Sequence, residues 1–242
     1  MRCAELLGND HPETVISMTQ RAQVTKAQGR YQEAREQFRE ALKGWERLYG
    51  LSHPESFQAA SAEARCSYKL GDLAAARARL ERTLPAAQGG QLADGDIARS
   101  AFRLLYTVDQ AGGWTEPRRR LVHDMLPVWR RIVANGGDES YTAHLGIALA
   151  FLDEGHADRS AAEQALREAK RSAELMAKDP VSSEITRVCS ALAAQAQAES
   201  ILGHPSDAVR LQREAIQKVP PDERLLRARF EALLAQYEAA AR

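Results

Sequence analysis

Apolar residues recur along this chain at the three- and four-residue spacing of amphipathic helices. Tyr31, Ala34, Phe38 and Ala41 show the pattern first, with small alanines where two helices must approach closely. The pattern returns in residues 73–84 and again in residues 208–216. Because β-branched residues are scattered singly instead of gathered into the short runs that strands need, the sequence predicts an all-α protein.

A short phrase occurs twice in the sequence, at an interval of 42 residues. LLGNDHPETV at residues 6–15 returns as LYGLSHPESF at residues 48–57. A glycine follows each apolar segment, first at the same interval of 42 and then after 48: Gly29, Gly71, Gly113, Gly155 and Gly203. A period between about 20 and 50 residues is typical of stacked repeats. We expect each glycine to end a helix in the left-handed conformation.

The repeated phrase has the composition of a helix start. Asp10 and Ser52 are the expected N-caps, and Glu13 and Glu55, three residues later, are the expected capping-box partners. His11 and His53 belong to the phrase, so we expect them to make equivalent local contacts in neighbouring units.

These starts and stops predict about five antiparallel helical hairpins and one further helix that caps the last hairpin. The expected hairpins cover about 12–49, 54–88, 93–135, 138–177 and 180–219, and the capping helix covers 222–241. At the N-terminus, RCAELLG has the composition of the last turn of a second helix. We therefore predict that the chain is a fragment of a longer protein.

LGNDHPETV and AQGRYQEAREQFREAL resemble the tetratricopeptide repeat (TPR), in the long form found in kinesin light chains and in many bacterial regulatory proteins. The usual unit has 34 residues, so a unit of 42 has longer helices and turns. The resemblance implies one array over residues 1–242 that winds into a right-handed superhelical solenoid. It also implies a concave groove lined by the first helix of each hairpin.

Counting back from the hairpin glycines places a mixed set of cations, amides and tyrosines in that implied groove. They are Thr19, Gln23, Lys26, Ser61, Arg65, Tyr68, Lys69, Arg103 and Tyr106. Such a set suits an extended peptide that offers acidic or backbone groups. The alternative stays open that these residues form an ordinary polar helix face.

Two departures from the family narrow the expected ligand. The paired asparagines of kinesin-type first helices are replaced by Thr19-Gln20 and by Ala62-Glu63. The lysine and asparagine that clamp a C-terminal carboxylate in chaperone-binding members are absent at Thr19 and Gln23. A chaperone tail is therefore not the expected ligand.

Charge and cysteine content limit the partners and the compartment. Lys plus Arg and Asp plus Glu both total 33, so no net field attracts nucleic acid or an anionic membrane, and we expect neither as a partner. We interpret the arginine-rich EPRRRLVHDMLPVWRR as a solvated helix face. Cys3, Cys66 and Cys189 lie too far apart for a zinc or disulfide framework, and no apolar run could span a membrane. A cytoplasmic location is expected.

Motifs of catalysis are missing from the sequence. It contains no phosphate-binding glycine loop, nucleophile elbow or paired-histidine zinc helix. His123 and His144 have no ligand partner at the third or fourth position along their expected helices. We therefore expect no catalytic residues, no cofactor and no metal.

Three functional hypotheses remain. The first is a non-catalytic protein-interaction module that presents its groove to a peptide or helix of a partner protein. The second is a C-terminal regulatory or sensory arm of a larger bacterial signalling protein, such as a serine/threonine kinase or a transcription regulator. The third is self-association through the N-terminal hairpin, which has no cap of its own.

Overall fold

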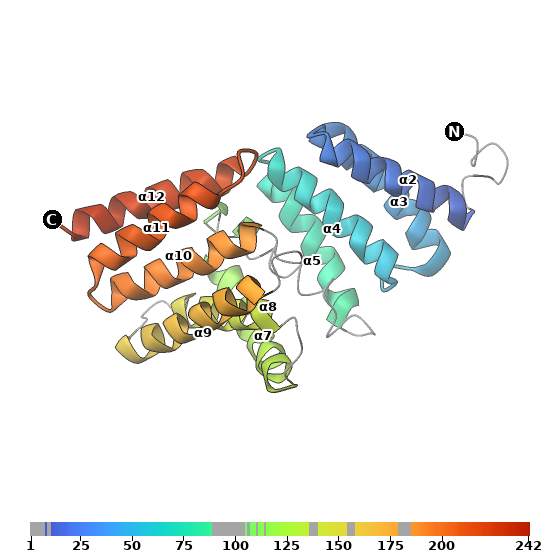
Figure 1. Ribbon diagram of the computed structural model, residues 1–242. Coiled ribbons are helices and arrows are strands. Elements are labelled where there is room, and N and C mark those ends of the chain that lie inside the picture. The colour runs from blue at the N-terminus through green and yellow to red at the C-terminus, as the bar shows by residue number, and fades with distance from the viewer. Residues whose placement is uncertain are drawn as a thin grey trace. The chain divides into compact units, whose positions relative to one another are not determined.

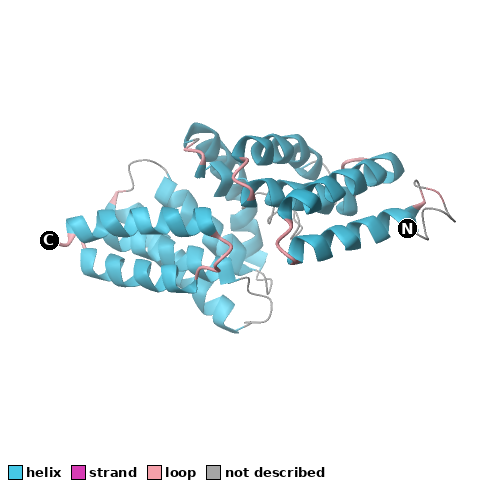
Figure 2. Cartoon of the chain, turned by 90° about the horizontal axis from the view of Figure 1, so that it is seen from above, coloured by secondary structure: helices cyan, strands magenta, loops and turns pink. Residues whose placement is uncertain are grey.

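The computed structural model describes residue 8 and residues 11–88, 105, 107–109, 111–113, 115–135, 140–153, 158–178 and 185–242. Every secondary-structure element in these ranges is a helix (Figure 2). None of these helices is long and apolar enough to cross a membrane. The chain divides into two compact units, Met1–Trp114 and Thr115–Arg242, and each is described by itself.

Residues 12–88 of the first unit form two complete hairpins. The helices of these hairpins are α2 (Pro12–Ala27), α3 (Tyr31–Tyr49), α4 (Pro54–Lys69) and α5 (Leu73–Gln88), and each packs on the next (Figure 1). Three-residue connections join α2 to α3 and α4 to α5, so the helices of each pair run antiparallel. α2 and α4 are thus the first helices of consecutive hairpins.

The second unit continues the same construction, with each helix packed on the next. The last pair of connected helices, α10 and α11, is followed by α12, whose Leu226, Phe230 and Tyr237 join their buried core. The helices, from green to red in Figure 1, are α7 (Thr115–Asn135), α8 (Ser140–Asp153), α9 (Arg159–Lys178), α10 (Ile185–Ile201), α11 (Pro205–Lys218) and α12 (Arg224–Ala240).

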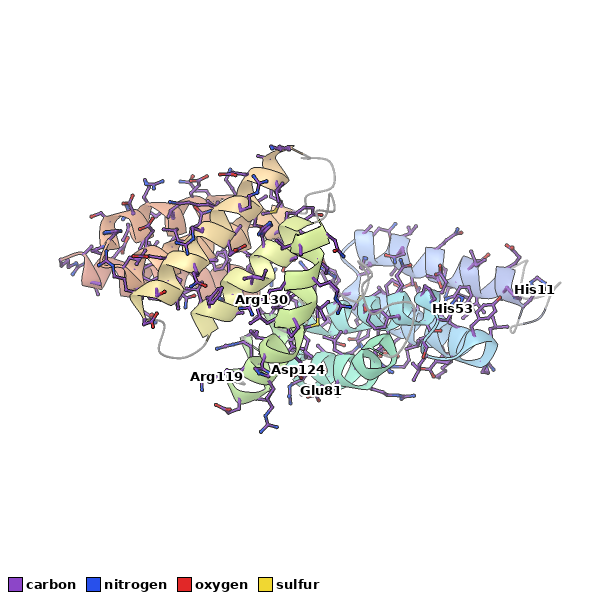
Figure 3. The ribbon with its side chains drawn as sticks, turned by 90° about the horizontal axis from the view of Figure 1, so that it is seen from below. His11, His53, Glu81, Arg119, Asp124 and Arg130 are labelled. Atoms are coloured by element: carbon purple, nitrogen blue, oxygen red, sulfur yellow. The ribbon has the colours of Figure 1, made fainter. Side chains whose placement is uncertain are left out.

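The N-caps of α2 and α4 are His11 and His53, which Figure 3 labels, so the expectation of Asp10 and Ser52 was wrong by one residue. Each imidazole Nδ1 accepts a hydrogen bond from the backbone N–H two residues later, at 3.2 Å and 3.3 Å. A proline at the first helical position has no N–H, and the ring nitrogen therefore satisfies the next one. The glutamate stands one position too early for a capping box.

A second contact closes the same turn in both copies of the phrase. The Thr14 hydroxyl donates to the Gly8 carbonyl oxygen at 2.8 Å, and the Ser56 hydroxyl donates to the Gly50 carbonyl oxygen at 2.6 Å. The two donors are 42 residues apart in sequence, and so are the two acceptors and the two N-cap histidines. The expectation of equivalent local contacts in neighbouring units is confirmed for this turn.

The hairpin glycines adopt the expected left-handed conformation wherever the structure describes them. Gly71 has φ = 80° and Gly113 has φ = 71°, a region in which a side chain meets the following carbonyl group. Gly155 lies outside the described residues. The prediction that these glycines end helices is confirmed at Gly29, Gly71, Gly113 and Gly203.

Replacement of Gly113 by alanine is expected to lower the free energy of unfolding by about 1–2 kcal/mol, because the new Cβ strains a backbone at positive φ. Gly112 is the matched control: it precedes Gly113 and does not have positive φ. Gly112→Ala should change stability by less than about 0.5 kcal/mol. Urea unfolding followed by circular dichroism measures both, and equal effects would contradict the conformational argument.

A nearly buried carboxylate links the two hairpins of the first unit. The Glu63 side chain is 5% exposed, and its oxygens lie 3.1 Å from Nε of Arg39 on α3 and 2.8 Å from Nε of Arg79 on α5. Because α4 supplies the acid and its two neighbours supply the cations, the charge is compensated inside the packed layer. This contact fixes the position of α4 between α3 and α5.

Glu63→Gln is expected to lower the free energy of unfolding by about 1.5–3 kcal/mol, the range for a lost hydrogen bond to a charged group. Glu36 provides the control, since it also pairs with Arg39, at 2.8 Å, but is 50% exposed. Glu36→Gln should cost no more than about 1 kcal/mol. If the two variants unfold at the same urea concentration, the buried carboxylate has no special role.

Candidate functional site

An open pocket of about 500 Å³ lies within the first unit, with α2, α3 and α4 all contributing to its lining. From α2 come Ile16, Gln20 and Gln23, one helical turn apart along a single face. Gln20 is exposed and Gln23 is half-buried. The pocket opens between the first helices of consecutive hairpins, where the family resemblance places the groove.

The aromatic part of the pocket is a stack of three rings. Tyr49 lies 5.9 Å from Trp45 and 4.4 Å from His53, measured between ring centroids, with the rings within 27° of parallel. Trp45 is only 3% exposed, whereas Tyr49 is 49% exposed. Tyr49 is therefore the ring that the stack presents to solvent.

The α4 side of the pocket is polar. Glu55, in the first turn of α4, and Gln58, one turn further, both line it. The imidazole of His53 accepts the Glu55 backbone N–H at Nδ1. In the part of the chain that the structure describes, the Glu55 carboxylate pairs with no cation.

Thr19, predicted as a groove contact, has its hydroxyl occupied inside the protein. The Trp45 indole N–H donates to Thr19 Oγ1 at 3.0 Å, and Thr19 Oγ1 donates to the Val15 carbonyl oxygen at 2.9 Å. Thr19 is 9% exposed. Its role in the structure is to hold the aromatic stack in position, and direct contact with a ligand stays a prediction.

Three predicted cations lie toward the ends of α2 and α4. Lys26 Nζ is 5.9 Å from the ring centroid of Phe38, and Lys69 Nζ is 5.9 Å from that of Tyr31. Like Arg65, both lysines are half-buried. Their stems therefore cover apolar surface while their charges remain near water.

The surroundings of the Cys66 thiol, which lies near these cations, make it unreactive. Burial raises the pKa of Cys66 to about 11, and the charges of Lys26 and Arg65 offset part of the rise. A thiol with this pKa is protonated at neutral pH, and only the thiolate is a strong nucleophile. Burial also raises the pKa of the Cys189 thiol, in the second unit, to about 11.

The remaining predicted groove residues differ in burial, and two of them lie outside the described residues. Ser61 is half-buried, and Tyr68 is 5% exposed and packed in the core. Arg103 and Tyr106 lie outside the described residues. The structure thus brings Thr19 and Gln23 together in the pocket, and it places Lys26, Arg65 and Lys69 toward the helix ends.

Sequence reasoning missed several residues of the pocket. Gln20 and Gln58 each lie on the helix face next to the predicted one. His53 and Glu55 were attributed to the turn alone. Tyr49 was not considered, although an aromatic residue directly before a helix-ending glycine was a usable signal.

No group of three His, Cys, Asp or Glu side chains is placed to hold a metal ion within the described ranges. His144 does have a carboxylate partner, because its Nδ1 lies 2.5 Å from Oε2 of Glu168. That partner comes from α9, the next helix, and sequence spacing along one helix could not indicate it. The pair joins α8 to α9.

Paired helices, short turns and a 42-residue register define a helical-repeat protein. The family model described as "Tetratricopeptide repeat" matches residues 2–44 and 16–89. The resemblance to tetratricopeptide repeats is confirmed within residues 2–89, and the all-α, TPR-like fold of the chain is confirmed. No curated protein matches the chain.

Two solved structures have the same fold. Nearly identical TPR-like repeats from Podosopora anserina, assigned to a kinesin light chain, share 16% identity, with 86% of this chain and 96% of that chain covered and a TM-score of 0.58. BtubC (BKLC) from P. vanneervenii shares 13% identity, with 85% and 80% covered and a TM-score of 0.60. At these identities the likeness establishes the fold alone.

Thr19→Val is expected to break the hydrogen bond from Trp45, because the isosteric valine cannot accept the indole N–H. The free energy of unfolding should fall by about 1–3 kcal/mol. The Trp45 indole signal in a ¹H–¹⁵N spectrum should move, with faster hydrogen exchange. Thr25 is the control: it is also buried, and its hydroxyl also donates one turn back, to the Arg21 carbonyl oxygen. A Thr25→Val variant with the same indole shift would contradict the assignment.

Proposed function

We propose that this chain is a non-catalytic protein-interaction module that presents the groove on α2 and α4 to a peptide or helix of a partner protein. The observation that carries the proposal is the open pocket between these helices. Tetratricopeptide repeat proteins generally bind protein partners, and the fold here is of that class. The pocket occupies the face on which the groove is expected.

The polar lining of the pocket suits a peptide backbone. Gln20, Gln23 and Gln58 each carry an amide that can both donate and accept, and their amides have no side-chain or backbone partner within the described part of the chain. An extended peptide exposes unpaired N–H and C=O groups that such amides satisfy. The exposed ring of Tyr49 supplies apolar contact beside them.

Other features favour binding over catalysis and protein over nucleic acid. The described thiols are buried and protonated, which is the wrong state for a nucleophile. On α7, the side chains of Arg119 and Asp124, labelled in Figure 3, are 42% and 64% exposed, but Trp129 is 9% exposed and packs on Gly146 of α8. A base could not stack on that ring.

The proposal places the module in the cytoplasm. Cys66 and Cys189 are free thiols, which a reducing compartment maintains. The two other hypotheses, a regulatory arm of a larger bacterial signalling protein and self-association through the N-terminal hairpin, stay predictions.

Selection of random peptides displayed on phage against the full chain tests the proposal. We expect binders whose affinity falls roughly tenfold when Gln20→Ala and Gln23→Ala are combined, because two amide contacts are lost. The double variant Gln217→Ala/Gln236→Ala is the control, since both glutamines are exposed and belong to the second unit.

A selection that returns no specific binder would count against an interaction module of this kind. Binders that are equally weakened by the control variant, or by neither variant, would place the interaction elsewhere on the chain. Circular dichroism of each variant verifies that the helices are intact.

A further inference from the structure

We infer that the pocket between α2 and α4 takes a basic side chain, an arginine or a lysine, from the bound partner. This inference rests on the proposed function and names the residue type that the pocket selects. It follows from three observations about the lining: its charge, its aromatic ring and its free amides.

The charge of the pocket is negative. Glu55 is the one charged side chain among the described residues that line it. Its carboxylate is half-buried and has no ion-pair partner in the described part of the chain. A cationic ligand group would therefore supply the missing counter-charge.

The exposed ring of the aromatic stack lines the same pocket as Glu55. Tyr49 is the exposed member, and aromatic rings attract ammonium and guanidinium groups through their electron-rich faces. Two intramolecular contacts show that this chain already uses the interaction, since Lys26 lies over Phe38 and Lys69 over Tyr31, each at 5.9 Å. No cation within the described residues performs that role at Tyr49.

The free amides complete the set of partners. The oxygens of Gln20, Gln23 and Gln58 accept hydrogen bonds, and a guanidinium group offers five donors in a planar fork. An apolar side chain would leave these amides and the Glu55 carboxylate without partners, at a cost in desolvation. The lining thus favours arginine over leucine on both charge and hydrogen bonding.

Four peptides test the inference directly: Gly-Ser-X-Ser-Gly with blocked ends, where X is arginine, lysine, glutamate or leucine. The readout is the shift of the Trp45 indole signal in ¹H–¹⁵N spectra of the full chain during titration. We expect the arginine and lysine peptides to bind with millimolar dissociation constants. The leucine and glutamate peptides should bind at least roughly fivefold more weakly.

Matched variants assign the effect to individual residues. Glu55→Gln should lower the affinity for the arginine peptide by roughly tenfold. Glu13 is its counterpart 42 residues earlier, at the start of α2 and outside the pocket lining, so Glu13→Gln should leave the affinity unchanged. Tyr49→Phe keeps a ring and should bind normally, whereas Tyr49→Leu should weaken binding.

The inference is overturned if the leucine or glutamate peptide binds as well as the arginine peptide, if neither basic peptide shifts the Trp45 signal, or if Glu55→Gln has no effect. The peptides selected by phage display separate this failure from failure of the proposed function. Binders that need Gln20 and Gln23 but no basic residue would leave the interaction module standing and remove the inference. A selection without binders would remove both.

Discussion

Close approach of helices through small residues is the constraint on which the first unit depends. At Gly44, α3 lies so near α2 that an added Cβ would be 2.7 Å from a methyl carbon of Val15. Ala59 and Ala60 of α4 pack in the same core cluster as Val15. Because α3 packs closely on both α2 and α4, these first helices face each other across a gap, and the large ring of Trp45 borders that gap. The pocket is thus a consequence of how the hairpins stack.

The charges of the groove first serve the helices that carry them. Glu55 stands in the first turn of α4, and Lys26 and Lys69 stand in the last turns of α2 and α4. Each sign complements the partial charge at that helix end. Helix stability alone therefore accounts for these charges, whereas it does not explain the exposed position of Tyr49.

Much of the fold could be predicted from the sequence, because the residues that start and end the helices of each repeat act through local contacts. Gly71 needs positive φ whatever surrounds it, and the hairpin spacing follows from such turns. The N-caps were misplaced by one residue because serine and aspartate are the usual caps, whereas here an imidazole Nδ1 of His11 or His53 takes that role. The site was harder to predict. Thr19 and Gln23 were found by counting, but the occupation of the Thr19 hydroxyl by Trp45 depends on a contact between two helices, which spacing along one helix does not reveal.

Residues that recur after 42 positions and residues that do not recur have different roles. His11, Thr14 and Gly29 have equivalents 42 residues later in His53, Ser56 and Gly71, and all of these shape turns. Trp45 and Tyr49 of the pocket do not recur in this way. Alanine and glutamine stand at positions 87 and 91, where the repeat would return Trp45 and Tyr49. Turn geometry must be the same at every junction for hairpins to stack, whereas a binding residue is needed only where the ligand lies. Loss of the repeat at Trp45 and Tyr49 is therefore what the proposed binding site at this junction predicts.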